Sequence, residues 1–207
     1  MFEWNLRRIV MPAIALCVAV AAHAQPVADK PKYAVGDRWE YKGRMMPDDT
    51  PNDATRTVVE IARSDLLKIR QETGKVVEYD GAMNFMPGGE KDYARVLVRY
   101  PLKVGDEWQM TRKFPNPGTV ETVKGKVVAY EPVTVPAGTF QCYRIEATTA
   151  LTNGDYKENR GWTRWYCPEI KWYAKERIDT TIVSPGKPQS SGTKVLAAEL
   201  VKFTPAK

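Results

Sequence analysis

The sequence predicts an all-β protein, built as a single curved antiparallel sheet or an incomplete β-barrel of roughly ten strands with little helix. Short runs rich in β-branched and aromatic residues recur along the chain, and Gly, Asn, Asp and Pro separate them as turn signals. No long stretch has the period of an amphipathic helix. We expect one β domain over residues 33–207, after a flexible polar leader at 25–32.

Residues 1–24 have the pattern of a secretory signal peptide. Arg7 and Arg8 precede an uncharged apolar run that ends in the small-residue pattern Ala22-His23-Ala24, so cleavage is expected after Ala24. The run is shorter than the ~20 apolar residues that a membrane anchor needs. The prediction is therefore an exported, periplasmic protein with no transmembrane segment after cleavage.

The strands follow one another closely along the domain. The segment 66–72 does not alternate cleanly and could form a helical turn, but its short length between two turn signals favours a strand. We expect strands at 37–44, 56–63, 66–72, 75–79, 95–100, 107–113, 120–135, 140–151, 156–167, 171–181 and 193–203.

Two cysteines, Cys142 and Cys167, remain after signal cleavage, and an even number in an oxidising compartment predicts a disulfide. The midpoint between them falls in the sequence Thr-Asn-Gly-Asp at 152–155, which favours a hairpin turn because Asn and Gly tolerate positive φ. A hairpin closed there sets the two cysteines opposite each other. The disulfide is therefore predicted to be a structural link across two strands.

Three further turns are expected. The sequences V-G-D-R-W at 35–39 and V-G-D-E-W at 104–108 echo each other, which favours a turn in which Gly takes the strained position and Asp caps it. Each turn would deliver a tryptophan into the next strand, and the alternative is a binding role for Asp37 or Asp106. The sequence Pro-Ala-Gly at 136–138 favours a third turn with a glycine bulge.

The segments V-P-A-G-T-F at 135–140, W-Y-C-P at 165–168 and Y-A-K-E at 173–176 resemble a family of uncharacterised exported bacterial β-proteins. Members of that family carry V-P-A-G-T-F, then W-Y-x-P, then a strand ending in K-x-E. The resemblance covers roughly residues 100 to 180. It implies a fold similar to the curved half-barrels of the lipoprotein carriers LolA and LolB, and it brings no catalytic residues with it. Cys167 stands where a small residue is usual, so the disulfide is not expected throughout the family.

Composition excludes several classes of enzyme. The only histidine, His23, lies in the signal peptide, so imidazole-dependent triads and most catalytic zinc sites are excluded from the mature chain. An enzyme with paired carboxylates stays open, although no pair stands out. We expect no enzyme activity, no cofactor and no metal site. The net charge of +6 is mild, and export makes nucleic acid an unsuitable partner.

Two functions fit the remaining features. The first is a binding or carrier protein for a hydrophobic or amphiphilic ligand such as a lipid, held on an aromatic concave face. The alternative is a structural or protein-interaction module of the cell envelope with a filled core and no small ligand. The hairpin register puts Tyr143, Ile145 and Ala147 on one face with Trp162, Arg164 and Tyr166. If there is a ligand, the predicted wall of its site is Phe140, Tyr143, Trp162, Tyr166 and Trp172, with Arg164 as the polar contact.

Overall fold

The computed structural model describes residues 26–62, 65–114, 116–186 and 191–207, which form one antiparallel sheet of 11 strands that does not close into a barrel. The predicted fold class is confirmed, and the predicted signal peptide lies outside the described residues. The strands are β1 (Arg38–Met46), β2 (Thr50–Pro51), β3 (Ala54–Ala62), β4 (Leu66–Gln71), β5 (Val76–Tyr79), β6 (Glu107–Lys113), β7 (Thr119–Val135), β8 (Gly138–Asn153), β9 (Tyr156–Cys167), β10 (Trp172–Val183) and β11 (Gly192–Thr204).

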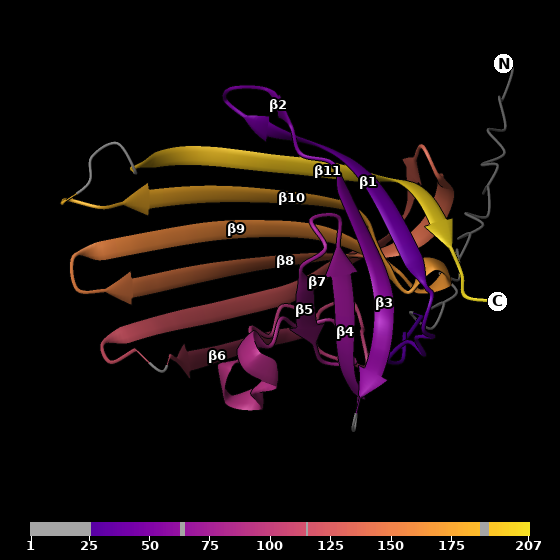
Figure 1. Ribbon diagram of the computed structural model, residues 1–207, viewed down its shortest axis with the longest axis horizontal. Helices are drawn as coiled ribbons and strands as arrows, with labels where there is room; N and C mark the ends of the chain where they lie inside the picture. Colours follow the sequence, from indigo (N-terminus) through magenta and orange to yellow (C-terminus); the bar gives the residue numbers. More distant parts are fainter. Residues whose placement is uncertain (1–25, 63–64, 115, 187–190) are drawn as a thin grey trace, which may run out of the picture.

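The sheet folds back across one of its own faces. Its order is β5-β4-β3-β1-β11-β10-β9-β8-β7-β6, with β2 paired to β1. Figure 1 shows β6 to β11 running side by side, with β1, β3, β4 and β5 crossing them at a steep angle. We call the face of β6 to β11 toward these crossing strands the inner face. The ends of β8 to β11 that carry the β8–β9 turn extend beyond the crossing strands, and we call them the open end.

Irregular pairing at four places accompanies this curvature. The register shifts between Glu40 and Tyr41 in the β1–β11 pair and between Tyr173 and Lys175 in the β10–β9 pair. Similar shifts occur in the β3–β4 and β7–β8 pairs. An extra residue in one strand bends it and increases the local twist. These bulges therefore help the two halves of the sheet to face each other.

Aromatic side chains join the two halves into one core. Trp39 of β1 is fully buried, its ring centroid lies 5.0 Å from that of Trp172, and its indole nitrogen donates to the carbonyl of Ile170 at 2.7 Å. Tyr41, also of β1, donates to the carbonyl of Tyr173 at 2.7 Å. Both partners belong to the chain around the start of β10. The crossing strands are therefore fixed to the disulfide end of the sheet.

The two V-G-D turns have the same construction. Gly36 and Gly105 have φ values of +105° and +97°, which favour glycine, and each turn exchanges two backbone hydrogen bonds with a valine of a neighbouring strand. Asp37 is fully buried and accepts hydrogen bonds from the backbone of Ala34, the backbone of Ala206 and the ammonium of Lys171. Asp37 therefore serves as a structural cap.

Of four turn and strand predictions, three are confirmed and one is wrong. The 66–72 segment is mostly strand β4, as expected. The β8–β9 turn forms at Gly154, with a φ of +58°, and the β7–β8 turn pairs Val133 with Phe140. The predicted strand at 95–100 is wrong, since only Arg95 makes an isolated bridge there.

Side chains replace strand pairing in the 95–100 segment. The amide oxygen of Asn84 accepts hydrogen bonds from the backbone nitrogens of Leu97 and Val98 at 2.8 and 2.9 Å. The indole nitrogen of Trp108 donates to the carbonyl of Val96 at 3.0 Å. Backbone groups satisfied in this way do not need a neighbouring strand. The apolar run Val96-Leu97-Val98 is therefore buried as part of a loop.

The connection from β5 to β6, residues 80–106, packs beneath the sheet. It contains two short 3-10 turns, η2 (Pro87–Gly89) and η3 (Lys91–Tyr93). Four of its buried apolar side chains join the two core clusters: Met83, Leu97, Val98 and Leu102. Part of the inner face is therefore covered by the protein's own chain.

We predict that Gly125→Ala destabilises the fold by about 1–3 kcal/mol, because the inner face has no room for a methyl group there. Gly125 of β7 pairs with Trp108 of β6, and a Cβ at Gly125 would overlap the Trp108 ring. Urea unfolding of the variant and the parent protein measures this change in the free energy of unfolding. Gly161→Ala is the matched control, since the nearest atom to its added Cβ lies 4.0 Å away. Equal unfolding midpoints for the two variants would contradict the prediction.

Candidate functional site

Four of the six predicted site residues lie in or against the packed core. Tyr143, Tyr166 and Trp172 are at most 2% exposed, and Phe140 is partly buried against the same cluster. Burial raises the pKa of Tyr166 to about 12, so its phenol stays protonated at neutral pH. These side chains contact the protein's own core residues. Their aromatic character is therefore explained by packing.

The other two predicted residues, Trp162 and Arg164 of β9, lie nearer the open end. The β8–β9 register sets Trp162 opposite Ala147 and Arg164 opposite Ile145, which confirms the face predicted from the hairpin. Trp162 belongs to a second, smaller apolar cluster, separate from the main core. The structure therefore divides the predicted wall into a packed part and a part beside the open end.

A buried carboxylate, Glu176 of β10, links the two halves of the sheet. It lies 3.0 Å from the guanidinium of Arg164 on β9 and 3.5 Å from that of Arg56 on β3, and its side chain is 5% exposed. Burial alone would raise the pKa of Glu176, but the two guanidiniums outweigh burial and hold its pKa below the ordinary range. Glu176 is therefore ionised at neutral pH and shared between two cations.

A second carboxylate is shared in the same way. Glu121 of β7 is fully buried, pairs with Arg95 at 2.8 Å and also pairs with Arg112 of β6. Burial and the nearby Arg95 lower the pKa of Arg112. On β9, Arg160 pairs with Glu158 at 2.8 Å. We call these eight residues the ion-pair belt: Arg56, Arg95, Arg112, Arg160, Arg164, Glu121, Glu158 and Glu176.

Trp162 lies among three guanidiniums of this belt. Those of Arg164, Arg160 and Arg95 lie 4.5, 5.7 and 5.8 Å from its ring. A cation within about 6 Å of an indole ring is attracted by the ring quadrupole. The side chain is 7% exposed, yet its indole nitrogen has no hydrogen-bond partner among the described residues. A buried N–H donor without an acceptor is costly, so this position is set up to donate a hydrogen bond.

A row of apolar side chains leads away from Trp162 across the inner face. Cross-strand pairing aligns Trp162 with Ile178 of β10, Ile178 with Leu196 of β11, and Leu196 with Met45 of β1. Residues directly opposite in an antiparallel pair point to the same side of the sheet. We call these four residues the open-end row. Ile178, Leu196 and Met45 are only partly buried, so apolar surface remains uncovered beside the belt.

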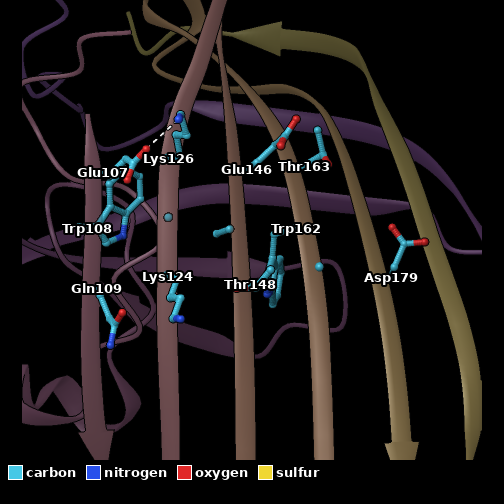
Figure 2. A pocket seen from close by; sticks show the side chains of 13 residues that line it. Glu107, Trp108, Gln109, Lys124, Lys126, Glu146, Thr148, Trp162, Thr163 and Asp179 are labelled. Atoms are coloured by element: carbon cyan, nitrogen blue, oxygen red, sulfur yellow. Dashed lines mark hydrogen bonds and ion pairs between the residues drawn. The ribbon is translucent and has the colours of Figure 1, made fainter. Parts of the chain in front are cut away.

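A hollow lies on the opposite, outer face. It has a volume of about 720 Å³, and its exposed rim is polar (Figure 2). Gly161 of β9 lines the hollow and has no side chain to fill it. Two carboxylates at its rim are paired, Glu107 with Lys126 at 2.7 Å and Asp179 with Arg177 at 2.8 Å. The outer hollow is therefore a polar depression with charges of both signs at its rim.

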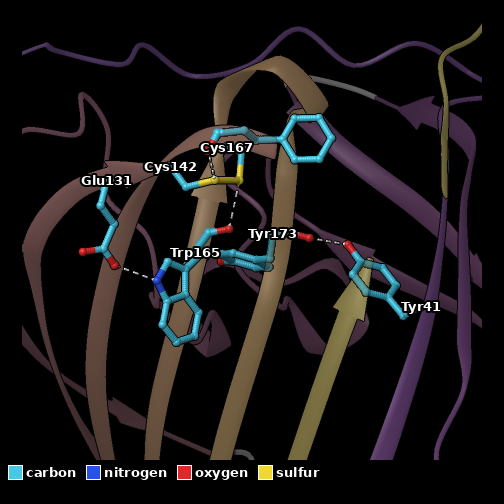
Figure 3. The surroundings of a disulfide bond; sticks show 7 residues. Tyr41, Glu131, Cys142, Trp165, Cys167 and Tyr173 are labelled. Atoms are coloured by element: carbon cyan, nitrogen blue, oxygen red, sulfur yellow. Dashed lines mark hydrogen bonds between the residues drawn. A yellow bond between two sulfur atoms is a disulfide. The ribbon is translucent and has the colours of Figure 1, made fainter. Parts of the chain in front are cut away.

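The predicted disulfide between Cys142 and Cys167 is present, at the end of the sheet opposite the open end (Figure 3). Beside it, Trp165 donates from its indole nitrogen to Glu131 at 2.8 Å. The bond closes a loop between residues 25 positions apart. It therefore secures the packed end of the β8–β9 hairpin, away from Trp162.

The described residues hold no group of three or more His, Cys, Asp or Glu side chains placed to bind a metal ion. No helix in this part of the chain has the length and apolar character needed to cross a membrane.

Comparison with known proteins gives likeness in structure only. No protein-family model matches the chain, and no curated protein matches it. The family resemblance of its motifs therefore stays a prediction.

Two solved structures are similar in fold. The hypothetical lipoprotein YmcC from Escherichia coli is 9% identical, with a TM-score of 0.44 over 84% of this chain and 91% of that chain. A protein from Bacteroides fragilis with a YmcC-like fold is 13% identical, with a TM-score of 0.43 over 86% of this chain and 99% of that chain. At these identities the two structures say nothing about what this chain binds.

The sequence prediction missed most of the ion-pair belt. A usable signal was present, because charged residues in β9 alternate with the same period as Trp162 and Tyr166. Glu158 and Arg160 therefore lie on the face that the hairpin register marks as inward. Their partners on other strands, such as Glu176, depend on the sheet order.

We predict that Glu176→Gln destabilises the protein by about 3–5 kcal/mol at neutral pH, because it leaves Arg56 and Arg164 buried without their shared anion. The lowered pKa of Glu176 determines how this stabilisation depends on pH. The carboxylate's stabilisation is complete above its ordinary pKa of 4.5 and is lost as the pH falls through the lowered value.

Urea unfolding of both proteins between pH 7 and pH 3 measures this difference, which should shrink below about pH 4. The control is Glu199→Gln, which removes an exposed pair with Lys175 and should change stability by less than about 1 kcal/mol. An unfolding difference for Glu176→Gln that stays constant over this pH range would contradict the role of the ionised carboxylate.

Proposed function

We propose that this chain is a non-enzymatic, exported binding protein that holds one amphiphilic molecule on its inner face at the open end. The observation that carries the proposal is the position of Trp162. Among the residues that the structure describes, its buried indole nitrogen has no acceptor, while partly buried aliphatic side chains begin at the next strand. A polar group paired with the indole and an apolar chain along the open-end row together describe an amphiphile.

The apolar part of the ligand has surface to cover. Ile178, Leu196 and Met45 lie side by side on consecutive strands, and each is only partly buried. Removing apolar surface from water contributes roughly 25 cal/mol per Å². An acyl chain lying across these residues would gain this contribution without displacing the main core.

The packed aromatic residues have a supporting role in this proposal. Trp172 packs against Trp39 of the crossing strand β1, and Tyr143 and Tyr166 belong to the same buried core cluster. They hold the inner face rigid. Of the sequence-predicted wall, Trp162 and Arg164 remain the candidates for ligand contact.

A second candidate function uses the outer hollow. The hollow spans β6 to β10, and a protein partner lying across it would fit an envelope interaction module with a filled core. Its polar rim and low floor favour an extended polar contact. This candidate predicts no small ligand on the inner face, so the two functions are separable by variants on opposite faces.

We predict that Leu196→Asn lowers the affinity for single-chain C12 to C14 amphiphiles about tenfold, because it places an amide in the open-end row. Isothermal titration calorimetry below the critical micelle concentration measures this, together with native mass spectrometry of the purified protein. Ala197→Asn is the matched control, since Ala197 is the next residue and is exposed. Absence of saturable binding to every amphiphile tested would sink the proposal.

The outer hollow gives an independent check. Gly161→Phe should fill the hollow without strain, because the nearest atom to an added Cβ is 4.0 Å away. We expect amphiphile binding to be unchanged in this variant. A photo-crosslinker at Thr148 then tests the second candidate in cells, and a partner crosslink abolished by Gly161→Phe would favour the interaction module.

A further inference from the structure

We infer that the ligand's headgroup is an anion, a carboxylate or a phosphate, bound by Arg160 and the indole nitrogen of Trp162. This inference rests on the proposed amphiphile site and specifies its chemistry. It excludes neutral and cationic amphiphiles as the preferred ligands.

The charge balance of the ion-pair belt supports an anion. Glu176 is shared by two guanidiniums and Glu121 by two more, while Arg160 pairs with Glu158 alone. The belt thus holds five guanidiniums against three carboxylates, which leaves an excess of positive charge on the inner face. Charges in a region of reduced solvent access are weakly screened. A ligand anion would therefore be attracted there.

The hydrogen-bond inventory agrees with the charge balance. The indole nitrogen of Trp162 is a donor only, and within the described part of the chain it is buried without an acceptor. The three guanidiniums around its ring also donate and never accept. A hydrogen-bond partner for the indole must therefore be an acceptor. Carboxylate and phosphate oxygens accept such bonds more strongly than neutral groups do.

The register places this anion site beside the apolar surface. Arg160 and Trp162 are two residues apart on β9, so both point to the inner face, and Ile178 lies directly opposite Trp162. Arg160 pairs across the sheet with Thr180, and Thr180 pairs with Lys194 of β11. A second cation therefore stands in the row of Arg160. The headgroup would lie beside Arg160, and the acyl chain would lie along the neighbouring open-end row that begins at Trp162.

Among the three arginines around Trp162, Arg160 is the most accessible to a ligand. Its side chain is 28% exposed, whereas those of Arg95 and Arg164 are 13% and 14% exposed. Its carboxylate partner, Glu158, also accepts a hydrogen bond from the hydroxyl of Tyr156 at 2.9 Å. Glu158 is thus satisfied in part without Arg160. A ligand anion can join this pair while the more deeply buried pairs stay intact.

The experiment compares ligands that share one C12 chain. Dodecanoate and dodecyl phosphate are the anionic probes, monododecanoylglycerol the neutral one and dodecyltrimethylammonium the cationic one, each titrated below its critical micelle concentration. We expect the anionic probes to bind about tenfold or more tightly than the neutral probe. Acetate and inorganic phosphate, which lack the chain, should bind more weakly than either anionic probe.

Arg160→Gln should lower the affinity for the anionic probes about tenfold and the affinity for the neutral probe by much less, so that most of the preference for the anionic probes is lost. Arg177→Gln is the matched control, because Arg177 has the same charge, lies exposed on β10 and pairs with Asp179. Circular dichroism confirms that both variants fold.

The outcomes separate the two proposals. Equal affinity for the anionic and neutral probes, or an unchanged preference in Arg160→Gln, overturns the anionic headgroup and leaves the amphiphile site standing. Inorganic phosphate binding as tightly as dodecyl phosphate identifies a free anion as the ligand and overturns the amphiphile. Failure of all the probes overturns the proposed function, and the inference falls with it.

Discussion

The ion pair that Glu176 forms with Arg56 and Arg164 fixes how the sheet folds on itself. Arg56 lies on a crossing strand, whereas Glu176 and Arg164 lie on the strands beneath it. A buried carboxylate is tolerated only when cations and hydrogen bonds compensate the loss of water. This requirement makes the crossing angle specific, because apolar packing alone tolerates sliding between the two halves. The aromatic contacts of Trp39 and Tyr41 then complete the core.

The ion-pair belt also divides the inner face into two regions of different character. On the disulfide side, the aromatic residues Tyr143, Tyr166 and Trp172 are buried in the main core cluster. On the open side, a smaller cluster around Trp162 meets aliphatic residues that stay partly exposed. A ligand needs uncovered surface, and the second region supplies it. The belt supplies the charge that would choose among ligands.

Strand positions and the hairpin were largely predictable because they depend on local chemistry. The turn at Gly154 and the alternation along β9 set Cys142 opposite Cys167 and Tyr143 beside Tyr166. The segment 95–100 was not predictable, because Asn84 and Trp108 satisfy its backbone from elsewhere in the chain. Alternation shows that a segment is half-buried. It does not show whether another strand pairs with it.

The candidate site likewise has one part that was predictable from local sequence and one part that depends on tertiary contacts. The sequence by itself determined that Trp162, Arg164 and Tyr166 share one face, because alternation and hairpin register are properties of neighbouring strands. Only the tertiary structure decided that Tyr166 is packed core while Trp162 adjoins Ile178 and the ion-pair belt. Burial depends on which distant strands cover a face, and the crossing strands stop short of the open end. The alternation of side chains along a strand determines which face of the sheet a residue lies on, whereas the curvature of the sheet determines which other strands cover that face.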